Sequence, residues 1–156
     1  MDSVTMRPIG VVETEATRDE VKDKDHVSRI VLRSGLEGAL EGLDEFSHLF
    51  VLFWMHEVPG EDKPLRVHPR GRLDKALVGV FATRSPQRPN SIGLSLVELL
   101  SIEGRVLTVQ GLDAFDGTPV LDIKPFDSWD MEETARVPDW WARLEEERSG
   151  RGSSGS

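Results

Sequence analysis

The sequence has 156 residues, no cysteine and a formal net charge of −9. This length suits one domain with a single core, and the lack of cysteine excludes disulfides, thiolate catalysis and cysteine-based metal sites. Four scattered histidines argue against a metal centre, and no apolar run approaches the roughly 18 residues of a membrane helix. We therefore expect a soluble, cytoplasmic protein that uses neither a metal nor a membrane.

Short β-branched apolar runs, separated by Gly, Pro and Asp, predict a mainly β fold. Gly104 lies between the fifth and sixth runs and predicts an antiparallel hairpin. Asp116 and Gly117 predict a tight turn before the last run. The seven expected strands cover residues 6–13, 28–33, 48–54, 78–82, 94–102, 106–112 and 120–123.

The segments between and after the strands differ in polarity and spacing. Residues 13–25 carry charges at most positions and a single valine, so we expect a mobile loop. Apolar residues spaced from 36 to 43 predict one or two helical turns. From Pro138 a short helix is expected, docked by Trp140, Trp141 and Leu144. The Gly/Ser run 149–156 predicts a flexible tail after one domain, residues 1–148.

Basic residues gather in one part of this acidic chain. Residues 63–90 hold seven Lys or Arg side chains and one acid, Asp74, a local net charge of +6. Such a run is often only a solvated surface. It also suits a site for an anion or for nucleic-acid phosphates. The charge pattern alone leaves both interpretations open.

A proline-rich loop within residues 79–95 joins two of the expected strands. Its two prolines, at 86 and 89, fix φ and lower the entropy of the free loop. Arg84, Arg88 and Asn90 would then be held ready for an anionic or carboxylate group. The alternative is a plain connection whose arginines pair with surface acids.

Polar side chains also occur in two other segments, at positions where an expected strand would reach a cleft. An apolar run ends in His56 and Glu57, and the segment 111–125, around the turn before the last strand, presents three carboxylates, Asp113, Asp116 and Asp122. Acids in turns are usually turn formers, and a lone histidine is more often structural. Neither segment identifies a site by itself.

Together the three segments resemble the TsaA/TrmO family of tRNA methyltransferases. The family's central loop, typically ATR-S-x-x-RPN-x-IGLS, is present as residues 82–95, and its turn motif DGTPVxDIKP as residues 116–125. Residues 8–12 and 42–49 are similar as well, so the resemblance covers about residues 6–126. The match is specific because the motifs are long, separated and in order.

The resemblance implies a small single-domain β-barrel with short peripheral helices, usually a homodimer. It implies an enzyme that uses S-adenosylmethionine to methylate N6 of N6-threonylcarbamoyladenosine beside the anticodon of tRNA. The nitrogen must lose a proton, which Asp113, Asp116 or His56 would accept. The residues that match the family's motifs, together with Arg88 and Asn90 of the proline-rich loop, form the expected cofactor site. It comprises His56, Glu57, Arg84, Arg88, Asn90, Leu94, Gln110, Gly111, Leu112 and Asp113. The tRNA phosphates would be bound by Arg66, Arg70, Arg72 and Lys75.

Two departures from the family pattern affect this expectation. Ser91 stands where the family commonly has a second proline, and residues 18–25 lack the Pro-Gly stretch that helps enclose the cofactor in familiar members. Two other functions stay open: a methyltransferase that acts on a small molecule, and a non-catalytic sensor that binds the cofactor or RNA.

Overall fold

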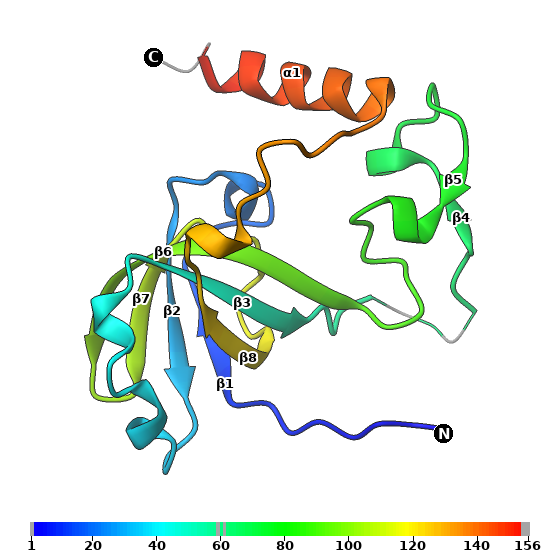
Figure 1. Ribbon diagram of the computed structural model, residues 1–156. Coiled ribbons are helices and arrows are strands. Elements are labelled where there is room, and N and C mark those ends of the chain that lie inside the picture. The colour runs from blue at the N-terminus through cyan, green and yellow to red at the C-terminus, as the bar shows by residue number, and fades with distance from the viewer. Residues whose placement is uncertain (1, 59, 61, 154–156) are drawn as a thin grey trace.

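The protein folds as a closed antiparallel β-barrel, which confirms the expected mainly β class (Figure 1). The computed structural model describes residues 2–58, 60 and 62–153. Around the barrel the strands follow the order β1-β2-β7-β6-β3-β8. Their bounds are β1 Gly10–Glu13, β2 Val27–Leu32, β3 His48–Trp54, β6 Ile92–Glu103, β7 Val106–Gln110 and β8 Pro119–Pro125.

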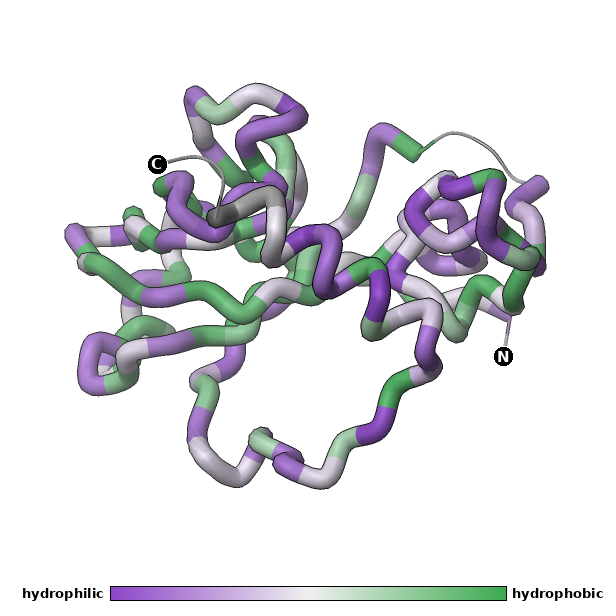
Figure 2. Tube along the Cα trace, turned by 90° about the horizontal axis from the view of Figure 1, so that it is seen from above, coloured by the Kyte–Doolittle hydropathy of each residue, from purple (hydrophilic) through white to green (hydrophobic). Residues whose placement is uncertain are grey.

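The barrel closes around one core because successive side chains of a strand point to opposite faces, which sends every second side chain inward. Along β6 the exposed and buried positions alternate from Ile92 to Glu98, although the exposed Ile92, Leu94 and Leu96 are apolar. Figure 2 shows hydrophobic and hydrophilic residues mixed along the trace. Ile30, Leu49 and Leu107 are fully buried in the core cluster. The expected hairpin is confirmed, since Glu103 pairs with Val106 across the turn.

The expected strand 78–82 is mostly wrong. Only β5 (Val78–Gly79) is extended, and it pairs with β4 (Arg66–Val67) in a separate two-stranded sheet. The next three residues form the 3-10 helix η5 (Val80–Ala82), because the Thr83 N–H and hydroxyl donate to the Val80 carbonyl oxygen at 3.1 and 2.7 Å. Both strands belong to residues 62–91, which stand apart from the barrel and are called the excursion below (Figure 1).

The first strand is shorter than expected, beginning at Gly10 instead of residue 6. Pro8 has no N–H to donate to a neighbouring strand, which limits pairing before this point. Ile9 still donates its N–H to the Val120 carbonyl oxygen at 2.8 Å.

The polar segment 13–25 is ordered in the structure, contrary to the expectation of a mobile loop. It contains the 3-10 helix η1 (Glu20–Lys22), and Val21 is 1% exposed. Thr17 and Glu20 bond reciprocally, each side chain accepting from the other's backbone N–H, and the bond from the Thr17 N–H lowers the pKa of the Glu20 carboxyl. This is a capping-box pattern, Thr-x-x-Glu, that the sequence contains and that sequence reasoning missed.

Short helices surround the barrel, as expected. The helical turns predicted near residues 36–43 are η2 (Glu37–Leu40) and η3 (Leu43–Glu45), while η4 (Pro69–Gly71) lies in the excursion and η6 (Ser128–Asp130) follows β8. None of the helices within the described residues has the length and apolarity needed to cross a membrane.

The C-terminal helix α1 (Asp139–Ser153) is longer than expected, so the first part of the predicted tail is helical. Adding a residue to an existing helix gains a hydrogen bond without a new nucleation cost. Residues 154–156 lie outside the described residues, and the division at residue 148 stays a prediction. Leu144 is 3% exposed and is the most buried side chain of α1, whereas Trp140 and Trp141 are half-buried.

Candidate functional site

The candidate site lies at the end of the barrel where β3 ends and β6 begins. Trp54 pairs with Ile92 across these strands, and beyond them the Met55 N–H donates to the Ser91 carbonyl oxygen at 2.8 Å. β8 begins at the same end, next to Phe53. The loops that carry the three sequence motifs therefore leave the barrel side by side.

The motif Ile-Gly-Leu-Ser lies at the start of β6, and its two inward-facing residues, Gly93 and Ser95, each have a structural role. Gly93 faces Phe53 across the strands, and a Cβ at residue 93 would lie 2.3 Å from the Phe53 ring. The Ser95 hydroxyl, 8% exposed, accepts the Asp113 N–H at 3.3 Å. Leu94 points outward and is 57% exposed. The motif thus bonds the Asp113 segment through its inward serine and presents Leu94 on the outer face.

The segment that precedes Asp113 is held by backbone contacts. Gly111 has φ of 92°, a left-handed conformation that favours glycine, and its N–H donates to the His26 carbonyl oxygen at 3.0 Å. The Gln110 side chain donates to the Asp25 carbonyl oxygen at 3.0 Å. Leu112 is fully buried in the core. Its side chain therefore faces the core, and only its backbone remains for the predicted cofactor contact.

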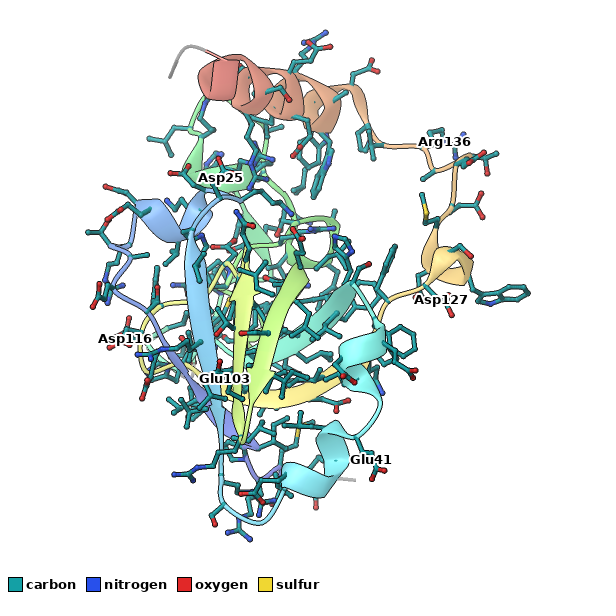
Figure 3. All side chains as sticks on the ribbon, turned by 90° about the vertical axis from the view of Figure 1, so that its left-hand side faces the viewer. Asp25, Glu41, Glu103, Asp116, Asp127 and Arg136 are labelled. Atoms are coloured by element: carbon teal, nitrogen blue, oxygen red, sulfur yellow. The ribbon has the colours of Figure 1, made fainter. Side chains whose placement is uncertain are left out.

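The carboxylates of the turn differ in their surroundings. Asp116 Oδ1 accepts the Thr14 N–H at 3.0 Å and so ties the turn to the end of β1. The exposed Asp113 carboxylate has no hydrogen-bond or ion-pair partner among the described residues. Figure 3 labels Asp116 on this turn, at the outside of the barrel.

Arg18 connects two parts of the site and was missed by sequence reasoning. Its guanidinium forms an ion pair with Glu57, which follows β3, and lies 4.4 Å above the Phe115 ring in the turn before β8. The residue sits in the Thr-x-x-Glu turn described above, which fixes the backbone from which it extends. Arg18 thus bridges the Glu57 segment and the acidic turn.

The proline-rich loop is braced by its own polar groups. Arg88 donates to the carbonyl oxygens of Thr83 at 3.0 Å and Ser85 at 3.3 Å, and Ser91 donates to that of Pro86 at 2.8 Å. Arg88 therefore shapes the loop from within. Arg84 is exposed, and none of the described residues forms an ion pair with it or accepts a hydrogen bond from it.

A pocket of about 700 Å³ lies between this loop and the N-terminal segment. Asn90 lines it, together with Trp54, Ile92 and Met6. His56 is half-buried, and its ring centre lies 6.0 Å from that of Trp54. Asn90 and His56 are thus both associated with Trp54 at this end of the barrel.

The four basic residues expected to bind tRNA all lie in the excursion, away from Asp113. Arg70 and Arg72 bond to α1, as detailed below, whereas Arg66 is exposed in β4 and Lys75 is half-buried. The structure therefore separates a cofactor-type site at the barrel end from a basic surface on the excursion. Within residues 2–58, 60 and 62–153, no three His, Asp or Glu side chains gather in a way that could hold a metal ion.

A closed antiparallel barrel with exposed acidic, basic and apolar side chains at one end defines a small ligand-binding β-barrel, distinct from the doubly wound nucleotide fold. The family model described as "tRNA-methyltransferase O N-terminal domain" matches residues 13–130. The chain belongs to this TrmO family, which confirms the resemblance seen in the sequence.

Two relatives with different names illustrate the family. The chain is 46% identical over 128 residues to a "Probable S-adenosyl-L-methionine-binding protein" of Methanothermobacter thermautotrophicus, covering 79% of this chain and 90% of the relative. It is 50% identical over 90 residues to a "tRNA (adenine(37)-N6)-methyltransferase" of Mus musculus, covering 58% of this chain and 21% of the mouse protein.

The crystal structure of TrmO from Pseudomonas aeruginosa shares the fold, with a TM-score of 0.70 and 32% identity. The match covers 90% of this chain and 62% of the bacterial chain. This chain therefore spans nearly all of the archaeal relative but less than two thirds of the mouse and bacterial proteins.

Proposed function

We propose that this protein binds S-adenosylmethionine at the barrel end and methylates tRNA. The names of the archaeal and mouse relatives support the cofactor and the reaction respectively. The proposal depends on one observation above all: the Ser95 hydroxyl accepts the Asp113 N–H, so two of the family's motifs meet at one place.

The side chains at this end suit the chemistry of S-adenosylmethionine. The cofactor combines an apolar adenine face, a positively charged sulfonium and ammonium, and a carboxylate. Leu94 offers an exposed apolar surface, Asp113 a carboxylate for a positive group, and Arg84 a guanidinium for the carboxylate. Glu57 would contribute through its pair with Arg18.

The proposed substrate is N6-threonylcarbamoyladenosine next to the anticodon of tRNA. The local charge of the excursion supports an RNA ligand despite the acidic total, because phosphate binding depends on nearby Lys and Arg. When bound, S-adenosylmethionine supplies a methyl group that its sulfonium has already activated. The protein then has to align the nitrogen with that group and exclude water.

The proton lost by the N6 nitrogen goes to Asp113 in our proposal. The new N–C bond forms as the C–S bond breaks, and the carboxylate takes the proton. Asp113 is preferred to Asp116 because one oxygen of Asp116 already accepts the Thr14 N–H. It is preferred to His56 because its backbone is bonded directly to Ser95 of β6.

Two measurements test the proposal. Calorimetry should detect S-adenosylmethionine binding, and mass spectrometry of tRNA nucleosides after incubation with the enzyme and the donor should detect a methyl group gained on threonylcarbamoyladenosine. Binding without transfer would support the sensor, to which the archaeal relative's name also corresponds. No binding at all would overturn the proposal.

Arg84→Ala tests the cofactor site more closely. A hydrogen bond to a charged group contributes about 1.5–3 kcal/mol, so we expect the Kd for S-adenosylmethionine to rise roughly tenfold to hundredfold. Arg136→Ala is the control, because Arg136 is an exposed arginine on the segment between β8 and α1 (Figure 3). Equal affinities of the two variants would place the cofactor elsewhere.

We also propose that the protein forms a homodimer. The excursion exposes four large apolar side chains, Leu65, Leu73, Leu77 and Phe81, which are between 54% and 82% exposed. Groups of exposed apolar residues usually mark interaction surfaces. The excursion would therefore provide the dimer contact.

A further inference from the structure

The C-terminal helix bonds to two of the four basic residues proposed to bind tRNA. Arg70 donates to the Leu144 carbonyl oxygen at 3.0 Å and forms an ion pair with Glu145. Arg72 donates to Glu147 at 2.6 Å. Figure 1 shows α1 extending from beside the excursion to a position over the barrel.

The charge of Arg72 is compensated from two sides. Besides Glu147 it bonds to both carboxylate oxygens of Asp74, at 2.9 and 2.8 Å. These hydrogen bonds raise the pKa of the Arg72 guanidinium, and the same contact lowers the pKa of the Asp74 carboxyl. Carboxylates and phosphates are recognised by the same planar arrangement of guanidinium donors. The helix therefore fills positions that phosphate oxygens would take.

We propose that α1 is an autoinhibitory cover whose Glu145 and Glu147 compete with RNA phosphates for Arg70 and Arg72. The inference rests on the proposed function for the class of ligand. RNA binding then requires α1 to leave the excursion, and a variant without the two glutamates binds RNA more tightly.

The backbone at Arg70 supports a specific arrangement rather than a chance surface contact. Arg70 has φ of 53°, the only positive φ of a non-glycine residue within the described part of the chain. Such a conformation is uncommon for residues with a side chain and persists where surrounding contacts fix it. The two bonds from Arg70 to α1 supply contacts of that kind.

The helix is attached in a way that permits release. The arginines and their glutamate partners have side chains between 35% and 45% exposed, so these ion pairs are weak and screened by salt. Leu144 is the one buried side chain among the described residues of α1. Residues 131–138, which connect α1 to the rest, are all exposed and contain no helix or strand. The match to the family model ends at residue 130, before α1 begins.

The test compares two double variants of the full chain. Glu145→Gln with Glu147→Gln removes the two partners of the arginines. Glu133→Gln with Glu146→Gln removes the same charge from exposed positions near and on α1 that have no partner among the described residues. Filter binding with bulk tRNA gives the Kd at two salt concentrations, and circular dichroism verifies that both variants are folded.

We expect the first variant to bind tRNA about fivefold more tightly than the second. Two additional phosphate contacts should also steepen the slope of log K against log salt by about 1.5, from roughly 0.7 to 0.9 per phosphate. Adding Arg70→Gln and Arg72→Gln to the first variant should abolish the gain. Equal affinities of the two double variants would overturn the cover.

Hydrogen exchange provides a second measurement that needs no substitution. Adding tRNA to the unaltered protein should speed amide exchange in residues 139–153, because α1 is displaced. Slower exchange there would contradict the inference. A methyl-transfer assay distinguishes the autoinhibitory role of α1 from the proposed function. If the first variant binds tRNA more tightly but no methyl group is transferred, the autoinhibitory role is supported and the methyltransferase activity is refuted. If methyl transfer occurs but the two variants bind tRNA equally well, the activity is supported and the autoinhibitory role is refuted. If no variant binds tRNA, both are refuted.

Discussion

Arg18 holds the edge of the candidate site through its contacts with Glu57 and Phe115. We expect Arg18→Ala to raise the Kd for S-adenosylmethionine severalfold, because the Glu57 segment and the acidic turn lose their bridge. Stability should change by less than about 1 kcal/mol, since an exposed ion pair contributes little. Calorimetry and thermal unfolding measure the two effects.

Arg29→Ala is the matched control for this change. Arg29 forms a similarly exposed ion pair with Glu13, at 3.5 Å, on neighbouring strands of the barrel. It has no contact with Glu57 or the acidic turn. If both variants weaken cofactor binding equally, Arg18 acts only through the general charge of the protein.

The Ser95 hydroxyl positions Asp113 through a hydrogen bond. The contribution of this bond can be distinguished from the effect of burying a serine hydroxyl. Ser95→Ala leaves the Asp113 N–H without its acceptor, so we expect a loss of about 1 kcal/mol in unfolding free energy and a larger fall in kcat than in cofactor affinity. Chemical denaturation and steady-state kinetics provide these values.

Ser28 offers the comparison, because its buried hydroxyl has no hydrogen-bond partner among the described residues. Ser28→Ala removes an unpaired polar group and should be neutral or stabilising. Equal destabilisation by the two changes would mean that the bond to Asp113 contributes nothing.

At the scale of the strand, Gly93 allows β3 and β6 to pack with the Phe53 ring inside the barrel. Gly93→Ala places a methyl group where the ring lies, so we expect a loss of about 1–3 kcal/mol in unfolding free energy. Gly79→Ala is the control, because no atom lies within 4 Å of a Cβ there and its φ is −59°. A Gly93 variant as stable as the Gly79 variant would refute this packing role.

The strands that sequence reasoning located best are apolar runs bounded by polar residues. The run 48–54 matches β3 residue for residue, and the start of β6 was missed by two residues. The strand expected at 78–82 failed because the Thr83 N–H and hydroxyl both donate to the Val80 carbonyl oxygen, which turns the chain after Gly79. The loop 13–25 failed because one valine and a Thr-x-x-Glu turn are enough to order it.

The site was predictable only as far as its motifs. Leu94 and Asp113 come from matched positions in the family's motifs. The contact between these two motifs depends on how the strands pair, because the Ser95 hydroxyl accepts from a residue eighteen positions later. Arg18 belongs to no matched motif, and its partners lie far along the chain. The glutamate partners of Arg70 and Arg72 are more than seventy residues away, so a local charge count, which includes only the nearby Asp74, could not reveal the pairing with α1.

For the whole molecule, the exposed apolar side chains of the excursion predict assembly into a dimer. Phe81 is 79% exposed, and burying an aromatic ring contributes strongly to an interface. Phe81→Glu would place a charge at that contact, so we expect sedimentation velocity at micromolar concentration to show a dimer for the unaltered protein and a monomer for the variant. Its circular dichroism should stay unchanged, because residue 81 contributes no buried surface to the barrel.

Trp129→Glu provides the control for this experiment. Trp129 is 93% exposed, but it stands on η6 between β8 and α1 and not on the excursion. Removing it should leave the dimer intact if the excursion forms the contact. If Trp129→Glu is monomeric and Phe81→Glu is still a dimer, the interface lies at η6. If the unaltered protein is a monomer, the proposed dimer is refuted. A monomeric protein would have to bind the cofactor and the RNA with a single chain, and the exposed apolar side chains of the excursion would then be available to contact the RNA.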